Sequence, residues 1–530
     1  MICNKAMTAT ESSVTLESTD GEVLAAEGAD GAQERQLEHR RVLLVFSGLM
    51  LGMMLAALDA TIVATALPTI VGDLGGLDRL SWVVTSYLLA QTVVTPLYGK
   101  FGDLFGRKTL FQIAITVFLV GSVLCGVAGT IGQLIVFRAV QGMGAGGLIV
   151  LAQAIIADVV SPRERGRYQG YFGAVFGMAT VIGPLLGGFF TDHLSWRWVF
   201  YVNVPVGIVA LLVTSATLPA NSRRRNVTID WAGTALLSAA ITALVLLTTW
   251  GGNDYGWLSP TILGLGAGVI VLVAALIFVE RRVAEPALPL RLFRLRTVSV
   301  ACALSFVVGI PMFGATTYLP TFLQVANGAS ASNSGLLLVP LMIGLISASM
   351  VVGQVVSRTG RYRAFPIAGM AVASLGMFLL STLGVDSSRL QSASYMVVVG
   401  IGIGLVMQVL IVSSQNEAPL EDLGVATSTV NFFRSVGGSV GVAVFGSMVS
   451  ARLTNLLGDA SALGLTPEQM RELPAAEQAQ LASAFADAIP GVFLLSVPVI
   501  VAGFALSWLL RETPLRTASG DARHGSLVHE

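Results

Sequence analysis

The stretch that decides the fold is GKFGDLFGRK, residues 99–108, which lies between two long apolar runs. Its glycines allow close contact between helices. Asp103 stands near a helix end, where its charge meets the helix dipole, and Arg107 and Lys108 are placed to face an anionic lipid surface. The stretch therefore predicts a tight, charged turn between two membrane helices.

The composition of the whole chain supports a membrane setting. Its 530 residues are 54% hydrophobic and 12% charged, with a mean hydropathy of +0.77, which excludes an ordinary soluble domain. The formal net charge is zero, so no general attraction to nucleic acid is expected. The three cysteines form no disulfide framework and no metal-ligand spacing. Because no phosphate-binding loop ending in Lys-Ser or Lys-Thr is present, we expect no cofactor and an ion gradient as the energy source.

Fourteen apolar runs are long enough to cross a membrane, since a bilayer needs about 20 apolar residues per helix. They include runs at 81–98 and 364–384. The expected all-α fold has two six-helix bundles, at 42–218 and 298–510, with an inserted helix pair at 219–297. A disordered cytosolic tail is expected at 1–41 and a further cytosolic tail at 511–530, with a long outer connection, ending in an amphipathic helix, at 450–488.

Lys and Arg residues set the expected orientation. With a cytosolic N-terminus, 24 of the 31 basic residues lie on the inner side and five on the outer side. Both termini are therefore expected in the cytosol. Residues 353–362, GQVVSRTGRY, occupy the matching position in the second half, with Gly353, Gly360 and Arg361 in place of Gly99, Gly106 and Arg107. Ser357 replaces the acid there, so no charge role is expected.

Several strings together resemble the major facilitator superfamily. GKFGDLFGRK is similar to its signature loop, residues 134–147 to its fourth-helix motif and residues 177–188 to its fifth-helix antiporter motif. The strings at 58–68, 196–207 and 424–446 resemble those of the fourteen-helix drug:proton antiporter branch of QacA/EmrB type. A preponderance of Arg over Lys hints at a high-GC bacterium. The other matching strings are LDATIVATALP (58–68), LIVFRAVQGMGAGG (134–147), GMATVIGPLLGG (177–188), WRWVFYVNVPVG (196–207) and GVATSTVNFFRSVGGSVGVAVFG (424–446).

Asp59 is the one carboxylate in the apolar run 49–68. A charge in hydrocarbon costs roughly 2.5 to 3.5 kcal/mol on insertion scales, so Asp59 is expected to face the protein interior. Arg138 in the fourth span lies at a similar depth, roughly 10 Å from the outer end. Either the two side chains form a proton-carrying pair, or they form a fixed ion pair that holds the bundle together.

Asp103, Arg107 and Asp158 form a second group of charged residues on the inner side. The resemblance implies that they form a charge network that closes the cytosolic side in the outward-facing state. The alternative is that these charges only set the orientation of the helices in the membrane.

Small and polar residues within the spans give further candidates. Glycines and a proline in GPLLGG suggest tight packing and a hinge near the interface between the halves. Arg434 either extends toward the inner surface or contacts an anionic substrate group. The hinge candidates are Gly183, Pro184, Gly187 and Gly188, and the candidate cavity residues are Tyr87, Gln91, Met178, Gln408 and Arg434.

The resemblance implies a proton-coupled antiporter that exports amphipathic small molecules, as in multidrug efflux. It implies a multi-pass protein of the cell inner membrane that functions as a monomer and is not an enzyme. A dedicated exporter of one endogenous metabolite, siderophore or lipid is the alternative. A proton symporter and a membrane sensor without transport are less favoured, because GPLLGG resembles an antiporter motif and no signalling domain is attached.

Overall fold

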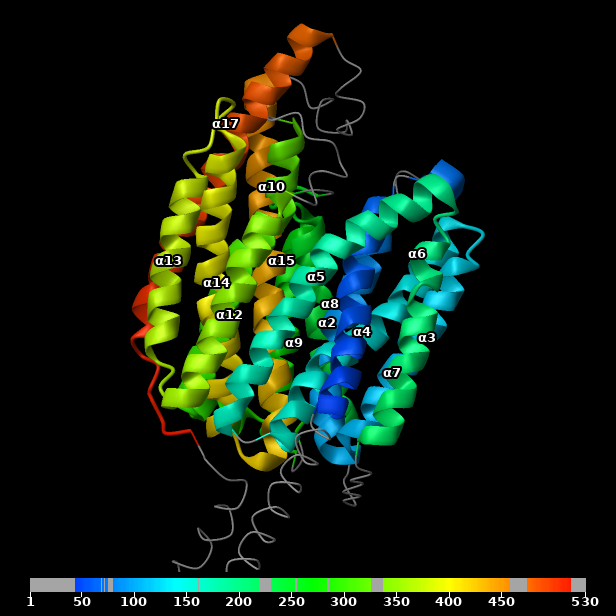
Figure 1. Ribbon diagram of the computed structural model, residues 1–530, viewed down its shortest axis with the longest axis vertical. Helices are drawn as coiled ribbons and strands as arrows, with labels where there is room; N and C mark the ends of the chain where they lie inside the picture. The colour runs from blue at the N-terminus through cyan, green and yellow to red at the C-terminus, as the bar shows by residue number, and fades with distance from the viewer. Residues whose placement is uncertain are drawn as a thin grey trace, which may run out of the picture.

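Figure 1 shows the computed structural model of the chain. The structure describes residues 43–67, 69–70, 72–74, 80–160, 162–218, 230–252, 255–283, 286–325, 337–457 and 474–515. The expected tail at 1–41 and the middle of the outer connection, 458–473, lie outside these residues. The described residues are helical apart from connections and one isolated bridge between Gly251 and Tyr255.

The first half begins with a helix at Leu43–Leu67, and both described ends of the chain lie at the end of the bundle that carries residues 99–108 (Figure 1). We call this the inner end. Side chains that cap helix starts fix some of the boundaries, as where Thr130 accepts a hydrogen bond from the Gln133 amide. The helices that follow are α2 Leu80–Phe105, α3 Arg107–Gly126, α4 Ile131–Val159, α5 Pro162–His193, α6 Trp198–Tyr201 and α7 Asn203–Thr217.

The inserted pair and the second half follow in chain order. Asp230 and Ser259 cap the two inserted helices, and Ser388 caps α14. The helices are α8 Trp231–Trp250, α9 Pro260–Glu280, η2 Leu290–Arg294, α10 Arg296–Val325, α12 Val339–Thr359, α13 Ala364–Leu380, α14 Arg389–Glu417, η3 Leu420–Asp422, α15 Leu423–Leu457 and α17 Ala475–Ser507.

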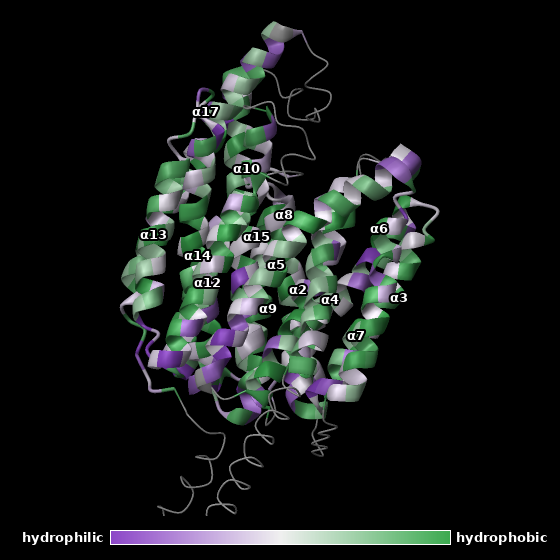
Figure 2. Ribbon diagram, viewed as in Figure 1, coloured by the Kyte–Doolittle hydropathy of each residue, from purple (hydrophilic) through white to green (hydrophobic). Residues whose placement is uncertain are grey.

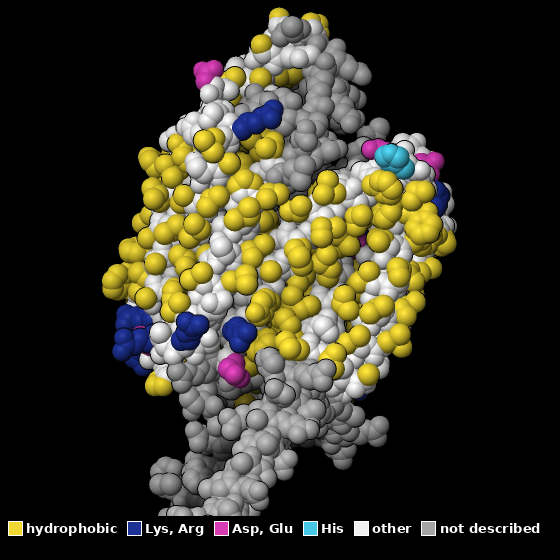
Figure 3. Space-filling model, viewed as in Figure 1, with side chains coloured by type: hydrophobic (Ala, Val, Ile, Leu, Met, Phe, Trp, Pro, Cys, Tyr) yellow, Lys and Arg dark blue, Asp and Glu magenta, His cyan; other side chains and the backbone are white. Residues whose placement is uncertain are grey.

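Twelve of the described helices are long and apolar enough to cross a membrane. Hydrophobic residues dominate the middle of the bundle in Figure 2, and most charged side chains on the face in Figure 3 lie at its two ends. Helices α2 and α13, at the expected spans 81–98 and 364–384, fall outside this set, and α13 is the shorter of the two. The chain is thus an all-helical, multi-pass membrane protein, and the count of fourteen spans stays a prediction.

The outer connection differs from the expected separate amphipathic helix. Residues 475–488 form the first part of α17, which continues unbroken to Ser507. Leu481, Ala484 and Phe485 are buried, so this segment packs against the bundle. Pro490 and Pro498 lie inside the helix without ending it, which neighbouring helices permit in membrane bundles.

The two halves meet at two corresponding helix pairs. α2 of the first half packs on α15 of the second, and α12 of the second half packs on α5 of the first. Gly99 lies against the backbone of Gly424, and Gly353 lies against the backbone of Gly166, where a Cβ would clash. The repeated glycines of 99–108 and 353–362 therefore serve the same purpose, close contact between the halves.

Two further glycines of this repeat share a backbone conformation. Gly106 ends the turn after α2 with φ 97°, and Gly360 caps α12 with φ 70°. A side chain is strained in this region, whereas glycine adopts it freely. The repeat seen in the sequence thus corresponds to a repeated turn at the inner end of both halves.

Candidate functional site

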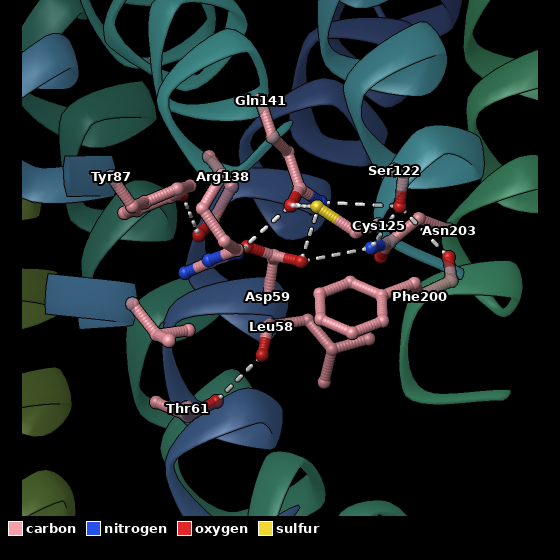
Figure 4. A network of polar contacts seen from close by, with 12 residues as sticks. Leu58, Asp59, Thr61, Tyr87, Ser122, Cys125, Arg138, Gln141, Phe200 and Asn203 are labelled. Atoms are coloured by element: carbon pink, nitrogen blue, oxygen red, sulfur yellow. Dashed lines mark hydrogen bonds and ion pairs between the residues drawn. The ribbon is translucent and has the colours of Figure 1, made fainter. Parts of the chain in front are cut away.

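The carboxylate of Asp59 lies in the interior of the first half and has no exposed surface. Its Oδ2 is 2.6 Å from Nη1 of Arg138 on α4, whose side chain is 2% exposed (Figure 4). The structure thus brings together the two charges that the sequence placed at one depth. Desolvation of two charges is costly, so this pair needs further polar partners.

Three uncharged side chains supply those partners. Gln141 Nε2 and Asn203 Nδ2 donate to Asp59 Oδ1, at 2.7 Å and 3.0 Å. Both amides also donate to the hydroxyl of Ser122, which in turn donates to the Phe200 carbonyl. Gln141, Asn203 and Ser122 were not predicted from the sequence. Each of them is an amide or hydroxyl side chain inside an apolar span. Such side chains are common in apolar spans, so they do not mark a site by themselves.

Arg138 is also enclosed by an aromatic ring and an amide. Its guanidinium carbon lies 4.0 Å from the ring centre of Tyr87, an arrangement that favours the cation. Its Nη1 also donates to Gln141 Oε1 at 2.8 Å, and its Nε has no hydrogen-bond partner among the described residues. Tyr87, expected in a substrate cavity, is 1% exposed and belongs to this network.

The Asp59 network holds one buried anion beside one buried cation. A proton on Asp59 would cancel the carboxylate charge and leave Arg138 as a buried cation. Water or another anion would then have to compensate that cation.

The inner charge network joins the end of α2 to α3 and α4. Arg107 Nη2 lies 2.6 Å from Asp103 Oδ1, and its Nη1 lies 2.7 Å from Asp158 Oδ1. Arg107 also donates to the carbonyl of Ala154 at 2.7 Å. The side chain of Asp103 is 3% exposed, whereas that of Asp158 is 51% exposed. The structure thus brings together all three residues of the expected network.

Asp103 also reaches across to the other half of the molecule. Its two oxygens accept hydrogen bonds from the amides of Gly424 and Val425, at 3.1 Å and 3.0 Å. These amides belong to the first turn of α15, where a helix leaves its N–H groups unpaired and carries partial positive charge. The carboxylate of one half therefore caps a helix of the other half.

A layer of amides connects the halves deeper in the bundle. Asn431 on α15 donates to Oε1 of Gln153 on α4 at 2.6 Å. Gln415 Nε2 lies 3.5 Å from the Gln153 carbonyl, and Arg434 donates to Asn431 Oδ1. Arg434 is 8% exposed, and its hydrogen bond to Asn431, one turn nearer the start of α15, holds it beside the contact between the halves.

The remaining cavity candidates lie on three different helices. Gln91 on α2 is half-buried, and Met178 on α5 is 48% exposed. Gln408 on α14 is 2% exposed, and its Oε1 has no hydrogen-bond partner among the described residues. These contacts do not define a common substrate pocket.

Two of the hinge candidates pack against the first helix of their own half. Gly183 and Gly187 lie against Thr61 and Thr65 of the first helix, within the same half, whereas Gly188 has open space around it. Pro184 lies inside α5 without ending it. The contact of α5 with the second half is made nearer its start, at Gly166, Gly170, Gly173 and Gly177.

At the outer end, Asp73 binds the segment before α6. Its Oδ2 accepts hydrogen bonds from the Trp196 indole at 2.8 Å and from Arg197 at 3.3 Å. The Trp196 hydrogen bond is the largest influence, and together with Arg197 it holds the pKa of Asp73 below its usual value. No group of three or more His, Cys, Asp or Glu residues in the described part of the chain is arranged to hold a metal ion.

Comparison with known proteins identifies the family. The family model of the Major Facilitator Superfamily matches residues 49–442. An uncharacterized MFS-type transporter of Mycobacterium tuberculosis is 47% identical over 486 residues, covering 90% of this chain and 71% of that protein. The multidrug transporter protein MdtP of Bacillus subtilis is 42% identical over 422 residues, covering 80% and 78%.

A solved structure shows the same fold. The MFS proton:xylose symporter XylE matches with a TM-score of 0.62 and 14% sequence identity, over 90% of this chain and 98% of that one. At this identity the likeness concerns the fold alone. From the family model, the relatives and the fold together, the chain belongs to the Major Facilitator Superfamily and is a membrane transporter, not an enzyme.

Proposed function

We propose that this transporter is a proton-coupled antiporter that exports amphipathic small molecules by alternating access. The observation that carries the proposal is the fully buried Asp59, whose charge is balanced by Arg138 and two amide donors. In this role Asp59 takes a proton from the outer side and releases it on the inner side. Substrate competes for the deprotonated state.

The contacts between the halves support alternating access. Asp103 and the glycines of α2, α5 and α12 hold the halves together at the inner end. Opening toward the inside would require these contacts to part, while each half keeps its own hydrophobic core. The described conformation is therefore assigned to an outward-facing state with its inner side closed.

The topology that we propose has fourteen spans, with both termini in the cytosol and the chain in the cell inner membrane as a monomer. The bias of Lys and Arg toward the inner end supports the orientation. The pair α8 and α9 supplies the two helices beyond six plus six. A proton gradient, rather than a bound cofactor, supplies the energy.

Proteoliposomes with an imposed pH gradient test this function. Purified protein is reconstituted, and proton movement is recorded on addition of ethidium-like cations or of neutral antibiotics. Substrate-induced proton flux against the substrate's movement is expected. Transport that does not depend on the pH gradient would contradict the proposal. Coupling to one compound class only would favour a dedicated exporter.

A further inference from the structure

Arg434 places a second buried guanidinium in the membrane region, within the second half. Eleven residues separate it from Leu423 at the start of α15, which at 1.5 Å per residue puts it about 16 Å from the inner end. Its side chain is buried, as is that of Arg138. The two arginines differ in their partners, because Arg138 is paired with Asp59 and Arg434 is not.

Arg434 lacks an acid as its counter-ion. Its one hydrogen bond within the described part of the chain goes to the uncharged amide oxygen of Asn431. In the first half, Asp59 is the acid at membrane depth, and it already pairs with Arg138. A guanidinium has five N–H donors, and a buried charge without a counter-ion is costly. The sequence offers no acid from the membrane-crossing parts of the second half, since Asp and Glu are absent from residues 296–385, 387–416, 423–458 and 488–511.

The position of Arg434 is beside the contact between the halves. Asn431, one turn nearer the inner end, donates to Gln153 on α4 of the first half at 2.6 Å. Gly438, one turn further outward, packs against the ring of Phe313 on α10. Residues three or four apart on a helix are neighbours, so Arg434 lies between these two contacts. It has a polar layer on its inner side and an aromatic ring on its outer side.

A second buried polar group lies at the same level of the second half. Gln415 on α14 donates to Thr427 on α15 at 2.8 Å, where these antiparallel helices meet near the inner end. Gln408 and Arg434 each lie seven residues further outward, which is almost two full turns, so they continue the same two helix faces. Gln408 is buried, and its Oε1 has no hydrogen-bond partner among the described residues. A buried acceptor of this kind requires a donor.

We propose that Arg434 binds the anionic group of the exported molecule, and that this molecule is an amphipathic carboxylate. A carboxylate supplies the missing negative charge and accepts two parallel hydrogen bonds from a guanidinium. An N–H or hydroxyl donor on the same molecule meets the unpaired oxygen of Gln408, and an aromatic body packs toward Phe313. The proposal rests on the proposed export of small molecules and adds the charge of the cargo.

Calorimetric binding to the full chain in nanodiscs of zwitterionic lipid tests the charge of the cargo. The probes are indole-3-acetate and indole-3-acetamide, which share an aromatic body and an N–H donor and differ in charge at neutral pH. Wild type should bind the carboxylate about tenfold or more tightly than the amide, the difference that a charge-assisted hydrogen bond contributes. Arg434→Gln should bind both probes with the affinity of the amide. Arg389→Gln, which removes an exposed arginine at the outer end of α14, should behave as wild type.

The thermal unfolding midpoint of the variants separates a binding role of Arg434 from a structural one. Arg434→Gln should keep the midpoint of wild type or raise it, because the variant removes a buried charge without a counter-ion. Arg138→Gln should lower the midpoint, because it leaves Asp59 unpaired. A midpoint that falls as far in Arg434→Gln as in Arg138→Gln would overturn the proposal.

Three binding results would also overturn it. They are no binding of indole-3-acetate to wild type, equal affinities of wild type for the two probes, and an affinity for indole-3-acetate that Arg434→Gln leaves unchanged. The binding experiment has no pH gradient, so a failure of proton coupling at Asp59 would leave its result unchanged. A failure of the proposed function and a failure of the anion site are therefore distinguishable.

Discussion

The Asp59 carboxylate and the Arg138 guanidinium lie 2.6 Å apart, although neither side chain reaches the solvent. Removal of one partner from such a buried pair leaves an uncompensated charge, at a cost of about 3–5 kcal/mol. Gln141 and Asn203 keep the pair in one geometry by donating to the second carboxylate oxygen. The pair and its two amide donors therefore join the first helix, α4 and α7.

Asn203→Leu tests whether the amides set the proton affinity of Asp59. The variant removes one donor that favours the ionised carboxylate, so the pH dependence of transport should move to higher pH. A shift of about one to two units is expected, since a hydrogen bond to a charged group contributes about 1.5–3 kcal/mol and one pH unit equals 1.36 kcal/mol. Asn416→Leu is the control, because that amide contacts Thr513 at the inner end. If the pH profile of transport moves equally in Asn203→Leu and Asn416→Leu, the result would contradict a role of Asn203 in setting the proton affinity of Asp59.

Asp103→Ala should weaken the closure of the inner end. It removes the hydrogen bonds to the Gly424 and Val425 amides, and charge-assisted bonds of this kind contribute about 1.5–3 kcal/mol. The population of inward-open molecules should rise by about tenfold or more, since 1.4 kcal/mol equals a factor of ten. Electron spin resonance distances between labels at Thr109 on α3 and Thr359 on α12, both exposed, measure this population.

Asp158→Ala is the matched control for the inner end. Asp158 contacts the same Arg107 but is half-exposed, and the hydrogen bonds from Asp103 to α15 stay in place. Its effect on the distance distribution should be clearly smaller. Equal distributions for wild type and Asp103→Ala would show that Asp103 does not hold the halves together.

Gly353→Ala tests the second contact between the halves. The added methyl group would meet the carbonyl of Gly166 on α5, and overpacking of this kind costs about 1–3 kcal/mol. The thermal unfolding midpoint should fall, or the halves should separate at the inner end. Gly188→Ala, also within a helix, has nothing within 4 Å of the new atom and should leave the midpoint unchanged or raised. If the unfolding midpoint falls by the same amount in Gly188→Ala, the close contact of Gly353 with Gly166 is not the cause of the effect.

The charged residues were the part of the site that sequence reasoning could predict. Asp59 and Arg138 stand out because a charge in a membrane helix is costly, and counting residues from the span ends placed them at one depth. Asp103, Arg107 and Asp158 were expected to form a network because the strings in the sequence resemble those of the family. The helix boundaries followed the apolar runs, because a membrane-spanning helix needs about 20 apolar residues.

Contacts between residues far apart in the sequence could not be predicted from local sequence patterns. Asp103 caps a helix more than 300 residues later in the chain, and nothing in residues 99–108 specifies that partner. Gln141 and Asn203 carry no charge, so their cost in a membrane helix is too small to single them out. Gly183 and Gly187 were assigned to the interface between halves, but small residues pack equally well within one half.

The most direct test of the central claim compares wild type with Asp59→Asn in proteoliposomes. Asn keeps the size of the side chain and loses the exchangeable proton, while Asp73→Asn controls for loss of an acid outside the membrane core. Substrate-induced proton flux should occur in wild type and Asp73→Asn, and should fall to the level of empty liposomes in correctly inserted Asp59→Asn. Undiminished flux in Asp59→Asn would contradict the account, because Asp59 would then be a structural partner of Arg138 only.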